Sequence, residues 1–141
     1  SLYSPVNGLC ILIECACVTS IVLLISYISC MLMFDLREYL TADGRSPFND
    51  WLLGLKDIRV RARIRAKLDR VSLGNFGDYA SVGGGVFELR MFFGPGYRVY
   101  FSLEEDQVVL LLHGGTKASQ QRDIRKAKSL MTDYRKRDNG N

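Results

Sequence analysis

Two apolar alternating runs meet at a Gly-Pro-Gly sequence in the middle of this chain, in the segment VFELRMFFGPGYRVYF at residues 86–101. Gly and Pro at such a junction favour a tight turn, so the segment predicts a β-hairpin. Side chains alternate along a strand, and the apolar residues of each run therefore share one face. Both apolar rows must face the core, which gives the hairpin a buried side.

The opposite face of the predicted hairpin carries Glu88, Arg90, Arg98 and Tyr100. Two guanidinium groups and a phenol on one sheet surface suit a phosphate-rich partner. The alternative is charge pairing of Glu88 with Arg90 or Arg98 across a solvated face. The residue types alone leave both interpretations open.

Residues 9–34 form an apolar run in which Glu14 is the only charged residue. A run of this length is long enough to span a bilayer as a helix. The first positive charges follow it, which would place the rest of the chain in the cytoplasm. The chain begins with Ser1 and Met33 precedes the first folded segment, so residues 1–32 are alternatively an upstream extension absent from the native protein. A buried or interfacial helix is the third interpretation.

Composition narrows the class of protein further. With 141 residues the chain is long enough for one domain with a true core, and its net charge of +4 is compatible with nucleic acid, an anionic membrane or an acidic protein partner. All four cysteines lie in the N-terminal apolar run, far from the single histidine, His113. The sequence therefore predicts no metal site, no cofactor and no disulfide framework. The cysteine-free remainder fits the cytoplasm.

The segments before the hairpin predict one strand and two helices. Residues 33–40 alternate as a strand, and Ser46-Pro47 is typical of a helix start. Residues 58–71 fit both the strand and the helix period, but their Ala, Arg and Leu content and the following Gly74 favour a helix. Residues 73–85 are predicted to be a loop.

The segments after the hairpin predict a strand buried on both faces at residues 108–113 and a helix at residues 119–134. The predicted fold class is α+β, with a small antiparallel sheet in the order strand, two helices, three-stranded meander and C-terminal helix, preceded by an N-terminal apolar helix. The predicted divisions are an apolar segment at residues 1–32, a folded domain at residues 33–135 and a polar tail at residues 136–141.

Four short motifs stand out in the folded part: ELR at residues 88–90, GPGYRVYF at 94–101, GG-x-K at 114–117 and QQRDI at 120–124. In combination they resemble the addiction-module killer proteins of the RelE/ParE toxin superfamily. The resemblance covers residues 33 to about 133, and the N-terminal apolar segment has no counterpart in that superfamily.

The resemblance implies a toxin encoded beside an antitoxin, often a helix-turn-helix protein. One branch of the superfamily cuts mRNA on the ribosome, and another poisons DNA gyrase. The killer proteins are closer to the first branch, which implies a ribosome-dependent mRNA endoribonuclease that inhibits translation. The alternative is a gyrase poison, or a degenerate toxin that only binds its antitoxin. The implied partners are the antitoxin, the ribosome and mRNA, with a membrane added if residues 9–34 insert.

RNA cleavage by the ribose 2′-hydroxyl needs that oxygen deprotonated, the new negative charge stabilised and the leaving oxygen protonated. Arg90, Arg98 and Lys117 are the expected charge stabilisers, and Tyr100 is the expected stacking or proton-moving group. Arginine is a poor base because its pKa exceeds 12, so the general base is not assigned. His113 ends a buried strand and is expected to be structural.

Four further residues are predicted to bind RNA: Arg61, Arg65, Tyr97 and Gln120. Arg61 and Arg65 belong to the basic face of the predicted helix at residues 58–71. A solvated face is the alternative interpretation of these charges.

Overall fold

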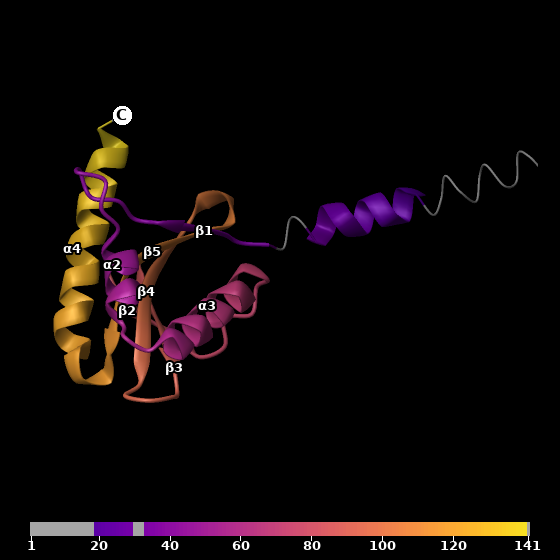
Figure 1. Cartoon of the computed structure of the whole chain (residues 1–141). Helices are drawn as coiled ribbons and strands as arrows, with labels where there is room; N and C mark the ends of the chain where they lie inside the picture. The colour runs from indigo at the N-terminus through magenta and orange to yellow at the C-terminus, as the bar shows by residue number, and fades with distance from the viewer. Residues whose placement is uncertain (1–18, 30–32, 141) are drawn as a thin grey trace, which may run out of the picture. The chain divides into compact units, whose positions relative to one another are not determined.

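The computed structural model describes residues 19–29 and 33–140 (Figure 1). The chain divides into two units, Ser1–Met33 and Phe34–Asn141. In the first unit residues 19–29 are helical, with exposed apolar side chains. The rest of the predicted N-terminal apolar helix, and with it half of the predicted membrane segment at 9–34, lies outside the described residues. In the part of the chain that is described, no helix is both long enough and apolar enough to cross a membrane.

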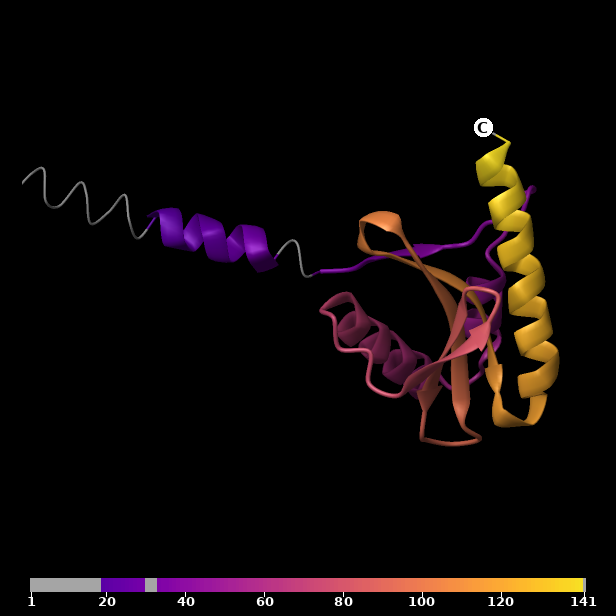
Figure 2. The ribbon, with the colours of Figure 1, turned by 180° about the vertical axis from the view of Figure 1, so that it is seen from behind.

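The second unit is a mixed α+β fold built on one five-stranded sheet. Its elements, in chain order, are β1 (Asp35–Glu38), α2 (Pro47–Gly54), α3 (Ile58–Ser72), β2 (Tyr79–Gly83), β3 (Val86–Met91), β4 (Tyr97–Glu104), η1 (Glu105–Gln107), β5 (Val108–Thr116), η2 (Lys117–Ser119) and α4 (Gln120–Asn139). The strand order is β1-β5-β4-β3-β2. Helices α3 and α4 lie on opposite sides of this sheet, as the two views in Figures 1 and 2 agree.

The sheet differs from the prediction in two ways. Strands β2 to β5 form an antiparallel meander, but β1 pairs with β5 in parallel, so the sheet is mixed. Strand β2 occupies part of the segment predicted to be a loop. The strand signal in the sequence of β2 is weak, because glycines lie close to both ends and only alternate residues are partly buried. The pairing of β2 with β3 stabilises the strand.

The local helix signals are confirmed. The Ser46 side chain accepts a hydrogen bond from the Asn49 backbone amide at 3.1 Å, and Asp57 accepts one from Arg59 at 2.9 Å. Gly74 follows α3 with a φ of +88°, a conformation that glycine adopts without strain. Residues 58–72 are therefore a helix and not a strand, and α4 continues into the predicted polar tail, as far as Asn139.

Two apolar clusters fill the spaces on the two sides of the sheet. One joins α2 and α3 to the hairpin's predicted apolar face, and its fully buried members include Ile64, Leu89 and Val99. The other joins α4 to the opposite face through Leu112, Ala127 and neighbouring residues. The hairpin register puts Phe87 opposite Phe101 and Leu89 opposite Val99, as the alternation predicted.

Strand β5 explains why a Gly-Gly pair ends an otherwise apolar run. The register with β4 shifts at Leu112, so His113 pairs with Tyr100 and faces α4. A Cβ atom at Gly114 would collide with the ring of Trp51 from α2, and one at Gly115 would collide with the carboxylate of Asp123 from α4. The two glycines allow one helix to approach β5 closely on each side.

Candidate functional site

A buried carboxylate, Glu88 of β3, joins four of the predicted site residues. Its Oε1 accepts a hydrogen bond from the Arg90 Nε at 3.0 Å. Its Oε2 accepts one from the Gln120 Nε2 at 2.8 Å and one from the Tyr100 hydroxyl at 3.2 Å. The Nε of Arg98 lies 3.7 Å from the same Oε2, an ion pair without a hydrogen bond.

The local electrostatics keep Glu88 ionised and Tyr100 neutral. Burial alone raises the pKa of Glu88, but the hydrogen bonds from Arg90 and Gln120 and the charge of Arg98 outweigh it and bring the pKa below its ordinary value. Burial, together with the charge of Glu88, raises the pKa of Tyr100 well above its ordinary value. Tyr100 is thus a hydrogen-bond donor to Glu88 at neutral pH.

Both interpretations of the polar face of the hairpin, a phosphate-binding surface and charge pairing on a solvated face, assumed that this face is exposed, and the structure corrects that assumption. Glu88 and Tyr100 are fully buried and Arg98 is 8% exposed, because α4 covers this side of β3 and β4. Only Arg90 stays partly exposed, paired with Glu88 and with Asp78. Cross-strand charge pairing is therefore present, but beneath a helix and not on a solvated surface.

Lys117 is exposed at the end of β5, beside this buried cluster. Its backbone amide donates a hydrogen bond to the Gly96 carbonyl at 2.9 Å, which fixes it against the turn of the hairpin. It belongs to a hollow of about 440 Å³, named here the α4 hollow, which is lined by Lys117, Ala118, Ser119, Gln120, Gln121, Arg122 and Arg125. The α4 hollow is lined by three cationic side chains and no carboxylate.

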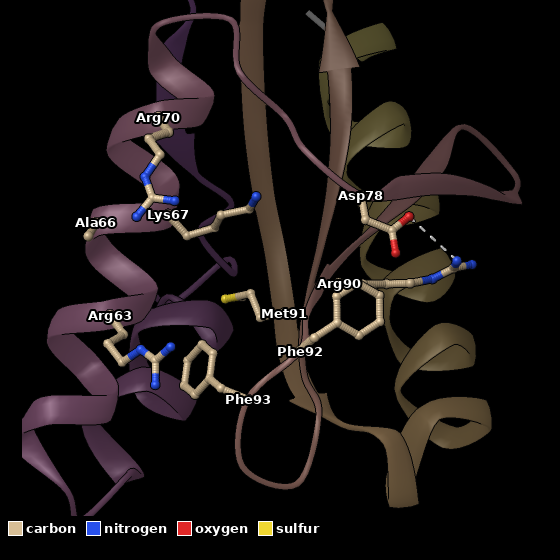
Figure 3. A pocket seen from close by; sticks show the side chains of 9 residues that line it. All are labelled: Arg63, Ala66, Lys67, Arg70, Asp78, Arg90, Met91, Phe92 and Phe93. Atoms are coloured by element: carbon tan, nitrogen blue, oxygen red, sulfur yellow. Dashed lines mark ion pairs between the residues drawn. The ribbon is translucent and has the colours of Figure 1, made fainter.

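A second hollow, of about 260 Å³, lies between α3 and the end of β3 and is named here the α3 hollow (Figure 3). Its lining residues are Arg63, Ala66, Lys67, Arg70, Asp78, Arg90, Met91, Phe92 and Phe93. Figure 3 shows the cations of α3 on one wall, the ring of Phe93 beside Arg63, and the ring of Phe92 on the other side of the strand, near Arg90 and Asp78. Four cationic side chains face a single carboxylate.

The turn of the hairpin connects the two hollows. Phe93 lines the α3 hollow, and its ring lies 5.2 Å from the ring of Tyr97. Gly96 precedes Tyr97 and accepts the hydrogen bond from Lys117, which lines the α4 hollow. The turn of the hairpin therefore contacts residues of both hollows.

The structure brings the predicted site residues together in part. Arg90, Arg98, Tyr100 and Gln120 meet at Glu88, and Lys117 lines the same hollow as Gln120. Tyr97 packs on the opposite side of the sheet, against the cluster that joins α2 and α3. Arg61 and Arg65 lie on α3 but line neither hollow. Their predicted role in RNA binding has no support from this placement and stays a prediction, as do the catalytic roles.

The predicted structural role of His113 fits its surroundings. Its Nε2 lies 3.2 Å from the Asp123 Oδ1, and Ser119 donates a hydrogen bond to the other oxygen of Asp123. Burial lowers the pKa of His113, although the charge of Asp123 opposes this shift. The neutral imidazole therefore ties β5 to α4, which leaves it poorly placed for proton transfer to a substrate.

Sequence reasoning counted Arg63, Lys67 and Arg70 among the cations of the basic helix, whose face either is solvated or contacts RNA or an acidic partner, but it did not single them out as binding residues. It gave Phe92 and Phe93 no site role. The spacing of the three cations, at positions i, i+4 and i+7, was the available signal, because it puts them on one face of a helix. Phe93 continues the apolar alternation of β3, which made it look like a core residue, whereas Phe92 falls outside that alternation. Phe92 is in fact 78% exposed.

Comparison with known proteins adds the family. Residues 50–132, from α2 to α4, match the family described as phage-derived protein Gp49-like (DUF891). The chain belongs to this Gp49-like family. A Haemophilus influenzae protein, named only as an uncharacterized protein, is 48% identical over 83 residues, which are 59% of this chain and 84% of that protein. The Gp49-like family is associated with the toxins of toxin–antitoxin modules. The matched region includes Glu88 and both hollows.

Proposed function

We propose that this Gp49-like protein is the toxin of a type II toxin–antitoxin module of the RelE/ParE kind, and that it cuts mRNA bound to the ribosome. The observation that supports this most is the α4 hollow, which is lined by three cations and lies beside the arginine cluster of Glu88. Such a concentration of positive charge suits the phosphate backbone of RNA. The proposed partners are mRNA, the ribosome and an antitoxin.

The residues of this site have different roles in the proposed cleavage by the 2′-hydroxyl. Lys117 is exposed and stabilises the extra negative charge on the phosphate as it forms. Glu88 contacts Arg90 and Arg98 at their Nε atoms, and the Nη1 of Arg90 lies 3.7 Å from Asp78, so the substrate phosphate would compete with Asp78 for the outer nitrogens of Arg90. Tyr100 and Gln120 complete the hydrogen bonding of Glu88. The ribosome orients the RNA, which lowers what the free protein must supply.

The test is a primer-extension map of cellular messages after brief induction of the protein. We expect cuts in phase with codons in translated messages. Lys117→Ala should lower the cutting rate about a hundredfold, because removing one donor that stabilises a developing charge typically costs that much. Lys56→Ala, which removes an exposed lysine between α2 and α3, is the charge-matched control and should cut like the parent.

Two outcomes would overturn the proposal. Intact messages together with an SOS response would favour a gyrase poison, and intact messages with normal growth would favour a protein that only binds its antitoxin. Equal cutting by Lys117→Ala and by the parent would remove the α4 hollow from the active site.

A further inference from the structure

We propose that the α3 hollow is a binding site for single-stranded RNA, in which a base stacks on Phe92 while the cations of α3 hold the adjoining phosphates. This inference deepens the proposed function and rests on it for the identity of the substrate. It concerns a different set of residues from those that act at Lys117.

The first observation is that the cations of the α3 hollow are available. Arg63, Lys67 and Arg70 follow one face of α3, and none of them forms an ion pair with any of the described residues. Arg45 and Arg59, by contrast, each form an ion pair with an aspartate. Three unneutralised cations in one row attract a polyanion with regularly spaced charges.

The second observation is that aromatic side chains line the same hollow as these cations. Arg63 lies over the ring of Phe93 at 3.9 Å from its centroid, and the exposed Phe92 lines the hollow on the side of Arg90 and Asp78 (Figure 3). Bases that are not paired in a duplex stack on such rings and on guanidinium planes. A large apolar side chain left this exposed is otherwise unfavourable in water, and a stacked base would cover it.

The third observation distinguishes RNA from an acidic protein segment. Asp78 lines the same hollow, 3.7 Å from Arg90. A carboxylate there repels an acidic peptide but accepts hydrogen bonds from the amino groups of a base. The volume of about 260 Å³ suits one nucleotide more than a helix of a partner protein.

The path from this hollow also leads to the proposed site of cleavage. Phe93 and Tyr97 lie in ring contact, and Gly96 is hydrogen-bonded to Lys117. A strand of RNA held in the α3 hollow can therefore continue over the aromatic turn toward Lys117. The α3 hollow would then bind nucleotides next to the cut and not the scissile phosphate itself.

The experiment measures binding of a fluorescently labelled single-stranded RNA oligonucleotide to the full-length chain by anisotropy, over a range of salt concentrations. Phe92→Ala should weaken binding about tenfold, which is the loss expected for one stacked base. Phe92→Trp should restore the affinity, because it restores a stacking surface. Arg70→Ala should lower the slope of log Kd against log salt by about 0.7, the value for one phosphate contact on a single strand.

Two control variants separate a specific site from general effects of charge and surface. Lys136→Ala removes an exposed cation at the far end of α4, and Leu53→Ala removes an exposed apolar side chain of α2. Both should bind RNA like the parent. A duplex RNA of the same sequence should bind more weakly than the single strand and should not respond to Phe92→Ala, because its bases are already stacked.

Several results would overturn the inference. Equal binding of single strand and duplex, with no effect of Phe92→Ala, would mean that only general electrostatic attraction is present. Binding of a labelled acidic peptide, weakened by Arg70→Ala, with no binding of RNA would assign the hollow to a protein partner. Loss of affinity in Phe92→Ala that Phe92→Trp does not recover would mean that the substitution acts through the fold.

The outcome is separable from that of the proposed function. If the α3 hollow binds RNA but no messages are cut in cells, the inference stands and the proposed function fails. If messages are cut and Phe92→Ala binds RNA normally, the proposed function stands and the inference fails. Lys117→Ala should lower the cutting rate about a hundredfold, and adding Phe92→Ala to that variant should still weaken RNA binding.

Discussion

Glu88 is a carboxylate with no exposed surface that contacts two arginines, a tyrosine and a glutamine. A buried charge is tolerated when charged and hydrogen-bonding partners compensate its loss of hydration. Each partner depends on it in turn, since Arg98 is itself nearly buried. An Arg98→Ala variant therefore tests folding as well as function, whereas Lys117 is exposed and its replacement tests function alone.

Glu88→Gln should lower the free energy of unfolding by about 3 kcal/mol, because it removes one partner of a buried ion pair and leaves Arg98 uncompensated. Urea denaturation at pH 7 measures this loss. Glu105→Gln, which changes an exposed glutamate in η1, should have no comparable effect. Equal stability of parent and Glu88→Gln would mean that the Glu88 charge does not support the fold.

The difference in free energy of unfolding between the parent and Glu88→Gln should depend on pH. The folded protein lowers the pKa of Glu88 below its ordinary value of 4.5, so the unfolded chain takes up the proton first as the pH falls. The stabilisation is complete above pH 4.5 and is lost below it. The difference in unfolding free energy between the parent and Glu88→Gln should therefore shrink on acidification below that pH.

At the scale of elements, the close contact between β5 and α2 depends on one missing side chain. Gly114→Ala should lower the free energy of unfolding by about 2 kcal/mol, because the added methyl group overlaps the ring of Trp51 and forces α2 to shift. Thermal or urea unfolding measures the change. A stable Gly114→Ala variant would mean that α2 moves away at little cost.

Gly54→Ala is the matched control. An added methyl group at Gly54 meets nothing within 4 Å, and the residue belongs to α2. Alanine is favoured over glycine in helices by up to about 1 kcal/mol, so this variant should be as stable as the parent or more so. The two substitutions add the same atoms, and only their surroundings differ.

At the scale of the whole molecule, the sheet and its three helices lie in the unit Phe34–Asn141. A chain that starts at Met33 should therefore unfold cooperatively, with a free energy of unfolding within about 0.5 kcal/mol of the full chain. Its solubility should be higher, because the exposed apolar side chains between Ile21 and Ile28 are removed. Calorimetry and light scattering on both chains measure these quantities.

The outcome that contradicts this prediction is a non-cooperative transition in the shortened chain. It would mean that residues before Met33 contribute to the fold of the second unit. If the shortened chain gives the same primer-extension map of cut messages as the full chain, the proposed activity needs none of the residues before Met33.

Local sequence determined the parts of the fold that depend on near neighbours. Ser46 and Asp57 cap helices because their side chains reach backbone amides only two or three residues away. The alternation from Val86 to Phe101 specified which side of each strand is apolar, since the pleat fixes it. The motifs also pointed to the toxins of toxin–antitoxin modules, with which the Gp49-like family matched over residues 50–132 is associated.

Tertiary structure decided the features that depend on distant segments. The polar face of the hairpin is buried because α4 packs over it. The sequence of α4 predicts a helix with one apolar side, but it does not predict which face of the sheet that helix covers. Strand β2 exists through its pairing with β3, and β1 is parallel to β5 because the meander ends beside it. The α3 hollow has the same origin: Arg63 and Phe93 are far apart in the chain, and only the packing of α3 against the sheet brings their charge and aromatic surface together.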